Sequence, residues 1–391
     1  MPFKLPSSLF CNRSLALLAA ACAASVPGAG VQAQDAGLGI EYRAESESSW
    51  HAVSASTEAL LIHGDGVLRL RTQLPPEAAA APNTAWVKAN AEEADAPATV
   101  LSQQVQRVEW SFTAGRGRAA EEGELAWLPD PDGSPAQVTA RAAQWSDNGA
   151  ASGSTTATAD SVPWQGERSI VLLPAVAYNR DGDGTLSGTI IGIYPNELDP
   201  AAPGPVARNP QDYAPPKWFH RLDEQTRDLA LSPHATLGTL NPAVLDGEGT
   251  RFVAIDADLI TLWESLHAVV ARERQGASGL RVLRGFVSPH ERQRLERLGV
   301  ALAPFSRFQY GDALAIVIDT NRDFRMDDLN GDGTISIADA ELLAEMTRTA
   351  LEEAGLAGGI GIAASFEGPN NIGTPYVHVD TRGWNLTWRE E

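Results

Sequence analysis

Residues 306–339 read SRFQYGDALAIVIDTNRDFRMDDLNGDGTISIAD, and the rest of the chain is interpreted outward from this stretch. Its second half, residues 328–339, has the spacing of an EF-hand-type calcium loop. Oxygen-bearing residues occupy positions 1, 3, 5, 7, 9 and 12 of this loop: Asp328, Asn330, Asp332, Thr334, Ser336 and Asp339. Gly333 occupies position 6, where the chain must turn with positive φ. The stretch therefore predicts a calcium site, although the Asp at position 12 is shorter than the usual Glu.

Two other acidic segments have part of the same pattern. Asp319, Asn321 and Asp323 have the spacing of positions 1, 3 and 5, but Phe324 stands where the loop needs glycine. A second calcium site and a solvated turn both stay open for this segment. Residues 179–183 (NRDGD) also begin like a calcium loop but lack an acidic residue at position 12, so a tight hairpin turn is favoured there.

The first half of the stretch resembles a known enzyme family. Ser306, Gly311 and Ala313 resemble the S-x-H-x-x-G-x-A-x-D signature of the zinc D-alanyl-D-alanine carboxypeptidases, also called LAS peptidases. Residues 376–383 (YVHVDTRG) resemble the second histidine motif of this family, and residues 326–333 (MDDLNGDG) resemble a bacterial branch with a calcium loop inside the domain. The resemblance implies a peptidase-like α+β domain over residues 206–391.

The chain departs from this family at the residues that carry the chemistry. The resemblance implies zinc held by His, Asp and His, but these positions are Phe308, Ala315 and His378. An arginine of the family is also replaced, by Val287. Because catalytic zinc needs three protein ligands and an open position for water, zinc is not expected here.

The remnants of such a site are His378 and Asp380. We expect the ring of Phe308 to fill the volume that zinc and water would need. The lone imidazole of His378 should then form a hydrogen bond with a polar neighbour such as Asp380 or Asp312.

The N-terminal segment, residues 1–33, has the pattern of a signal peptide. Lys4 and Arg13 precede a short apolar run at residues 14–26, and small residues at 31–33 form a cleavage site. The apolar run is too short to span a bilayer comfortably, so no membrane insertion is expected. The pattern predicts a periplasmic or secreted bacterial protein.

The net charge limits the kinds of partner that the chain can bind, and the positions of the cysteines limit disulfide formation. The formal net charge of −20 argues against binding to nucleic acid, since phosphate binding needs clustered Lys and Arg. Both cysteines, Cys11 and Cys22, lie inside the signal segment, so no disulfide is expected in the exported protein. Lipidation at Cys22 stays open.

Residues 34–165 predict an all-β, immunoglobulin-like sandwich. Apolar and polar residues alternate over residues 67–71 and 105–112, and turn residues separate the short strands. Trp110 and Trp127 are interpreted as core aromatics, with carbohydrate stacking as the alternative.

The connection between the two predicted domains is residues 166–205. We expect a hairpin that pairs residues 170–174 with residues 188–194, followed by a Pro-rich linker. The predicted fold class is therefore multidomain: an all-β sandwich, then an α+β LAS-peptidase-like domain with an EF-hand-type calcium loop.

Three functions are compatible with this sequence. The first is an exported calcium-binding pseudoenzyme that binds cell-wall peptide or an envelope protein. The second is an active zinc metallopeptidase on peptidoglycan peptides, with ligands rerouted through His234 or His290. The third is a structural or adhesion module. The first is favoured, because the loss of His, Asp and Arg removes both ligands and orienting groups.

Overall fold

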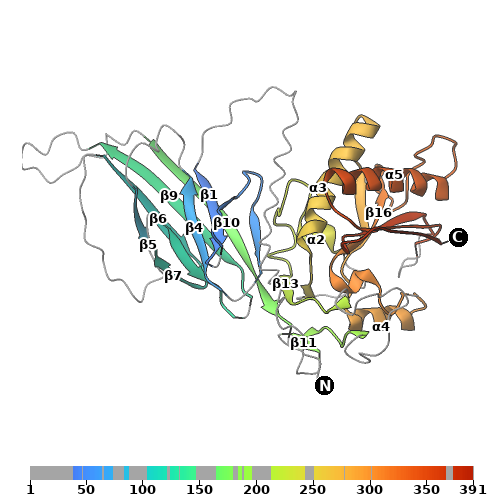
Figure 1. Cartoon of the computed structure of the whole chain (residues 1–391), viewed down its shortest axis with the longest axis horizontal. Coiled ribbons are helices and arrows are strands. Elements are labelled where there is room, and N and C mark those ends of the chain that lie inside the picture. Colours follow the sequence, from blue (N-terminus) through green and yellow to red (C-terminus); the bar gives the residue numbers. More distant parts are fainter. Residues whose placement is uncertain are drawn as a thin grey trace, which may run out of the picture.

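A computed structural model gives the fold, and it describes residues 38–45, 47–63, 66–73, 83–87, 104–120, 124–131, 133–146, 164–178, 184–186, 189–195, 213–242, 251–276, 278–300, 302–366 and 373–390. The described chain is rich in β-sheet, with strands on one side of the molecule and a mixed α+β part on the other (Figure 1). The predicted signal segment and residues 179–183 lie outside the described residues.

The N-terminal part is built from two sheets that share one apolar core. The first is five-stranded, in the order β2 (His51–Ala52), β1 (Gly39–Ala44), β4 (Leu68–Gln73), β8 (Leu125–Leu128), β7 (Arg116–Ala119). The second runs β14 (Arg251–Val253), β13 (Trp218–Leu222), β10 (Trp164–Ala177), β9 (Ala136–Ser146), β6 (Gln104–Phe112), β5 (Asn83–Val87), with β3 (Ala59–Ile62) paired to β10. Because apolar side chains from β1, β4 and β8 pack with those from β6, β9 and β10, the two sheets enclose the core between them.

Two tryptophans lie at the centre of this core. Trp110 on β6 and Trp127 on β8 are both fully buried, and the indole Nε1 of Trp127 donates to the carbonyl of Ala114 at 3.0 Å. Their interpretation as core residues is confirmed. Carbohydrate stacking on these two rings is excluded by their burial.

Strand β10 belongs to both halves of the molecule. Its first residues pair with β9 over Trp164–Leu172, and its last residues pair with β13 over Ala175–Ala177. The expected hairpin between residues 170–174 and 188–194 is therefore wrong, because Thr189 and Ile190 pair instead with Leu186 and Thr185 in the short sheet of β11 (Thr185–Leu186) and β12 (Thr189–Ile190). Both edges of β10 pair with strands that lie far from it in the sequence.

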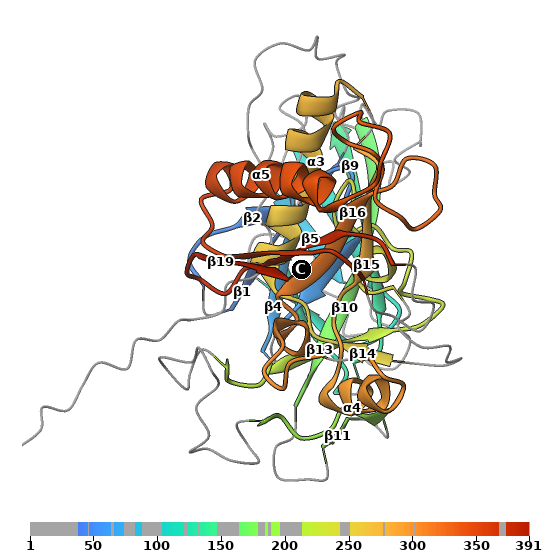
Figure 2. The same cartoon turned by 90° about the vertical axis from the view of Figure 1, so that its right-hand side faces the viewer.

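The C-terminal part is a five-stranded sheet covered by helices on one face. Its strand order is β15 (Leu280–Arg284), β16 (Ala313–Ile318), β18 (Tyr376–Asp380), β17 (Gly359–Ala363), β19 (Leu386–Glu390). The long helices α3 (Ala257–Arg274) and α5 (Ile337–Glu353) contact each other, and their axes cross beside this sheet (Figure 2). The shorter elements are α2 (Leu237–Leu240), α4 (Pro289–Arg297) and the 3-10 helix η4 (Arg307–Tyr310).

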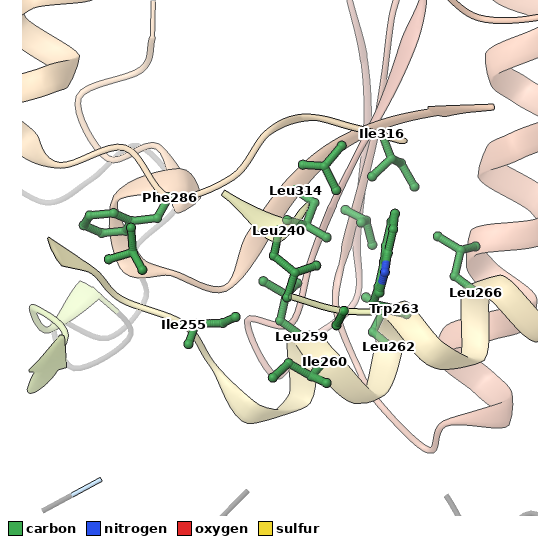
Figure 3. Packing of buried hydrophobic residues seen from close by; sticks show 14 of the residues in the cluster. Leu240, Ile255, Leu259, Ile260, Leu262, Trp263, Leu266, Phe286, Leu314 and Ile316 are labelled. Atoms are coloured by element: carbon green, nitrogen blue, oxygen red, sulfur yellow. The ribbon is translucent and has the colours of Figure 1, made fainter. Parts of the chain in front are cut away.

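The core of this part lies between α3, α5 and the sheet. Leu259, Leu262, Trp263 and Leu266 line the inner side of α3 and face Ile316 of β16 (Figure 3). The N-terminus of the helix is fixed by Asp256, whose side chain caps it by accepting from the Asp258 amide at 2.8 Å.

Helix α5 has recognisable capping residues at both ends. Ser336 and Asp339 form a capping box at its first turn, and Gly355 follows its last residues with φ of +67°. None of the helices in the described part of the chain is long and apolar enough to cross a membrane.

Candidate functional site

The three positions at which the sequence resemblance implies zinc ligands lie close together in the structure. Ala315 on β16 and His378 on β18 are cross-strand partners. Phe308 belongs to η4, directly before β16, and its ring lies edge-on to the His378 imidazole with ring centroids 4.9 Å apart. Residues separated by up to 70 positions in the sequence are thus brought to one place by the β16–β18 pairing.

His378 lies between two aromatic rings. Phe308 is on one side, and the indole of Trp388 from β19 is on the other, with centroids 4.7 Å apart. The indole lies over Gly361 of β17, where an added Cβ would come within 2.2 Å of Trp388 Cε2, so only glycine fits there. The imidazole is consequently almost buried, at 8% exposure.

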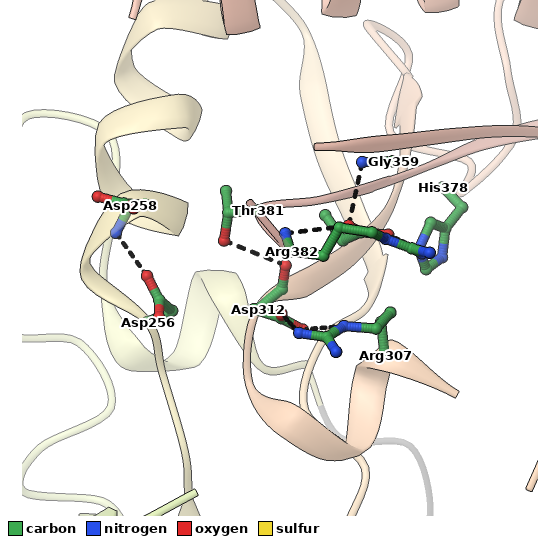
Figure 4. Close-up of polar contacts among 9 residues, drawn as sticks. Asp256, Asp258, Arg307, Asp312, Gly359, His378, Thr381 and Arg382 are labelled. Atoms are coloured by element: carbon green, nitrogen blue, oxygen red, sulfur yellow. Dashed lines mark hydrogen bonds and ion pairs between the residues drawn. The ribbon is translucent and has the colours of Figure 1, made fainter. Parts of the chain in front are cut away.

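The polar partner of His378 is Asp380, two residues further along β18. The Nε2 of His378 lies 3.0 Å from Asp380 Oδ2, which confirms one of the two partners expected. Asp380 also accepts from the amide of Gly359 at 3.0 Å and from Arg382 Nε at 2.6 Å (Figure 4). Burial alone would raise the pKa of the Asp380 carboxyl, but the hydrogen bonds from Arg382 and His378 outweigh burial and hold its pKa well below its usual range.

A second buried ion pair lies beside this group. Arg307 of η4 binds Asp312 through its Nε and Nη2 atoms, with Nε to Oδ1 at 3.2 Å (Figure 4). The turn between them needs Gly311, which has φ of +77° and whose added Cβ would lie 2.6 Å from the Ala254 carbonyl. Burial raises the pKa of Asp312 to about 6, against the lowering effect of Arg307 and with the nearby Asp380 charge adding to the rise.

Apolar side chains also pack around Phe308. Val287, at the position where the family has arginine, is fully buried, and its amide donates to the carbonyl of Phe308 at 3.0 Å. The side chains that pack together here are Val287, Leu295, Val300, Phe308, Ala313, Ala315 and Phe366. The volume expected to be filled by the Phe308 ring is thus part of a small hydrophobic cluster.

Arg284 is a residue of this site that sequence reasoning missed. It lies on β15 opposite Ala315, and its guanidinium stands 4.6 Å from the ring centroid of Phe366 and 5.6 Å from that of Phe308. Its position depends on a register shift between Val282 and Arg284, and no short-range sequence signal marks such a bulge.

The two histidines considered as rerouted ligands have partners elsewhere. The Nδ1 of His234 lies 2.7 Å from Glu264 Oε2, and its ring stacks on His267 of α3 at 4.2 Å. The amide of His290, at the start of α4, donates to the carbonyl of Ile191 at 2.9 Å. Neither interaction involves the β16–β18 site.

The calcium-type loop connects β16 to α5. Asp328 Oδ2 accepts from the amide of Gly333 at 2.7 Å, and Gly333 has φ of +85°, so the expected left-handed turn at position 6 is present. The fully buried Asp339 accepts from the amides of Leu329 at 2.7 Å and Ser336 at 2.8 Å. These bonds close the loop onto the first turn of α5.

Side-chain oxygens also accept hydrogen bonds from backbone amides in the middle of the loop. Asn330 Oδ1 accepts from the amide of Asp332 at 2.9 Å, and Asp332 Oδ1 accepts from the amide of Thr334 at 2.8 Å. In the described part of the chain, however, no three His, Cys, Asp or Glu residues stand close enough together to hold a metal ion. The backbone thus turns at Gly333 as expected, whereas the carboxylates of Asp328, Asp332 and Asp339 do not form such a group.

The second acidic segment turns in a related way. Asp319 Oδ1 and Asn321 Oδ1 each accept from the amide of Asp323 at 3.0 Å. The carboxylate of Asp319 also forms an ion pair with Arg281 of β15.

Comparison of the chain with protein-family models, with curated proteins and with solved structures finds no match.

Proposed function

We propose that this chain is an exported, calcium-binding pseudoenzyme of the zinc D-alanyl-D-alanine carboxypeptidase type. The observation that carries the proposal is the meeting of Phe308, Ala315 and His378 at one point of the sheet. The approach of His378 to Phe308 and Ala315, which lie more than 60 positions earlier in the chain, agrees with what the resemblance implies and supports the proposal.

The side chains at this point support binding without catalysis. Phenylalanine and alanine offer no ligand atom, and one imidazole does not hold a catalytic zinc ion. The third position, His378, is already held by Asp380 at 3.0 Å and covered by Phe308 and Trp388. Rerouting through His234 is not favoured, since its ring is held by Glu264 and stacks on His267, away from the β16–β18 site.

Calcium has a structural role in this proposal. The loop at residues 328–339 lies between β16 and α5, and its position-12 residue Asp339 is also part of the helix cap. An ion bound by this loop would neutralise the carboxylates of Asp328, Asp332 and Asp339 and fix the start of α5. We also propose that the N-terminal sheets form an immunoglobulin-like sandwich. The apolar core that the two sheets share supports this part of the proposal.

The partner that we propose is a cell-wall peptide or an envelope protein. The support for it is the family resemblance together with the predicted export signal. A pull-down on immobilised muropeptides distinguishes the two partners, because an envelope protein partner would not depend on the peptide matrix.

Restoring the family's ligands tests the pseudoenzyme proposal. The double variant Phe308→His/Ala315→Asp should acquire zinc affinity together with His378, and it should acquire that affinity before any peptidase activity. The matched control is Phe366→His/Ala313→Asp, which introduces the same side chains into the same apolar cluster at positions outside the ligand set. Equal zinc uptake by both variants, or none by the first, would overturn the assignment of these positions.

A further inference from the structure

The two acidic loops between β16 and α5 have the same backbone conformation. Position 1 of each loop accepts from the amide of its position 6: Asp328 from Gly333 at 2.7 Å, and Asp319 from Phe324 at 2.9 Å. Each loop is also closed by a carboxylate that accepts from the amide of its position 2. Asp339 does so in the first loop at 2.7 Å, and Asp327 does so in the second at 3.0 Å.

The left-handed residues coincide as well. In the loop at residues 328–339, positions 4 and 6 are Gly331 and Gly333, with φ of +74° and +85°. In the second loop, which we define as residues 319–327, the same positions are Arg322 and Phe324, with φ of +65° and +66°. Residues with a Cβ adopt this conformation at an energetic cost, so other interactions must hold it in place.

The charges of the two loops differ. Residues 328–339 contain three aspartates and no basic residue. Residues 319–327 contain the three aspartates 319, 323 and 327, but also Arg322 and Arg325. The second loop is therefore much less attractive to a divalent cation at the same backbone geometry.

A further cation reaches the second loop from β15. The Nε of Arg281 lies 2.6 Å from Asp319 Oδ2, as an ion pair without hydrogen-bond alignment, and the Asp319 side chain is fully buried. The same guanidinium lies over the ring of Phe324 at 4.3 Å from its centroid. One side chain thus contacts both the position-1 carboxylate and the residue at the glycine position.

We propose that the guanidinium of Arg281 is the built-in cation of the loop at residues 319–327, in the role that calcium has in the neighbouring loop. Arg281 balances the charge of Asp319 and stacks on Phe324, and so stabilises a calcium-type turn without a metal ion. The second loop consequently takes no calcium in the native chain. Removing the positive charge of Arg281 should convert it into a weak calcium site. The inference extends the proposed calcium role of residues 328–339.

Calcium titration of the full chain by isothermal titration calorimetry, after removal of metal with a chelator, tests this proposal. The native chain should bind one calcium ion, and Asp332→Ala, which damages the first loop, should bind none. Asp332→Ala/Arg281→Gln should regain one ion, with a Kd of about 10⁻⁴–10⁻³ M. The matched control, Asp332→Ala/Arg272→Gln, neutralises an arginine of α3 that pairs with Glu353, and it should bind none.

Two results would overturn the proposal. One is calcium binding by Asp332→Ala that disappears in Asp332→Ala/Asp323→Ala, because the second loop would then take an ion beside Arg281. The other is the absence of any calcium binding by Asp332→Ala/Arg281→Gln when its circular dichroism spectrum matches that of the native chain. If the native chain itself binds no calcium, the proposed role of residues 328–339 fails, while a gain of one ion by Arg281→Gln alone still supports the inference.

Discussion

The ring of Phe308 packs edge-on against the imidazole of His378, with centroids 4.9 Å apart and planes inclined by 74°. In the family that the sequence resembles, both positions hold zinc. Here one of them has become a hydrophobic residue in contact with the other. Under the proposed function, this contact fills with apolar atoms the space that a metal ion would need.

Truncating Phe308 should destabilise the chain strongly. Phe308 is buried in the apolar cluster with Val287 and Phe366, and Phe→Ala at such a site costs about 3–5 kcal/mol of unfolding free energy. Urea unfolding of Phe308→Ala measures this loss. Leu298→Ala, at a side chain that is 63% exposed, is the control and should cost less than about 1 kcal/mol. A loss for Phe308→Ala no larger than that of the control would show that the ring does not fill a packed space.

Calcium should stabilise the C-terminal part. An ion that binds only the folded state raises the unfolding free energy by about 2.7 kcal/mol at a hundredfold excess over Kd, so EDTA should lower the melting temperature and added Ca²⁺ should restore it. Asp332→Ala should abolish the response. Asp323→Ala, the corresponding aspartate of the second loop, should preserve it. A melting curve of the native chain that is indifferent to EDTA would rule out a structural calcium ion.

The pair of buried aspartates predicts an unusual pH dependence. The pKa of Asp312 is raised to about 6 in the folded chain, whereas the unfolded chain has the ordinary value of about 3.9. Between these values the folded state holds a proton that the unfolded state has released, so the contribution of Asp312 to stability falls as pH rises from about 4 to about 6. Asp312→Asn should remove this fall, which we expect to be on the order of 1–3 kcal/mol.

Asp380 should change the free energy of unfolding with pH in the opposite direction to Asp312. Its pKa is lowered in the folded chain, so its contribution to stability is present above about pH 4 and is lost as pH falls below that value. Urea unfolding between pH 3 and pH 7 separates the two residues, with Asp380→Asn flattening only the acidic end of the profile. Identical profiles for both asparagine variants would contradict the assignment.

The two halves of the chain should not separate cleanly. Leu173 of β10 and the residues Leu186, Ile191 and Tyr194 belong to the C-terminal core, although all of them precede the Pro-rich segment. A fragment that begins at Gln211 should therefore be insoluble. In the full chain, a protease site inserted within residues 196–212 and then cut should leave two pieces that co-elute in gel filtration. Native separation of the pieces would show that β10 does not bind the two halves together.

Local signals in the sequence predicted local structure well. The left-handed turn at Gly333 and the burial of Trp110 and Trp127 follow from residue type and local spacing. The convergence of Phe308, Ala315 and His378 was implied only by the family resemblance. The sequence alone does not show how close these three residues lie in the folded chain.

The features that were missed depend on long-range pairing. Strand β10 joins neighbours from both halves, and Arg284 reaches the site through a register shift. The left-handed conformations of Arg322 and Phe324 were also unpredictable, because both residues disfavour positive φ in isolation. Each of these features is fixed by contacts with residues far away in the chain, which periodicity and local composition do not record.

Metal analysis of the purified full-length protein by mass spectrometry tests the central claim most directly. The account predicts one calcium ion per chain and no stoichiometric zinc, before and after incubation with a zinc salt followed by desalting. One tightly bound zinc ion per native chain, lost in His378→Ala, would contradict it and would favour an active metal centre.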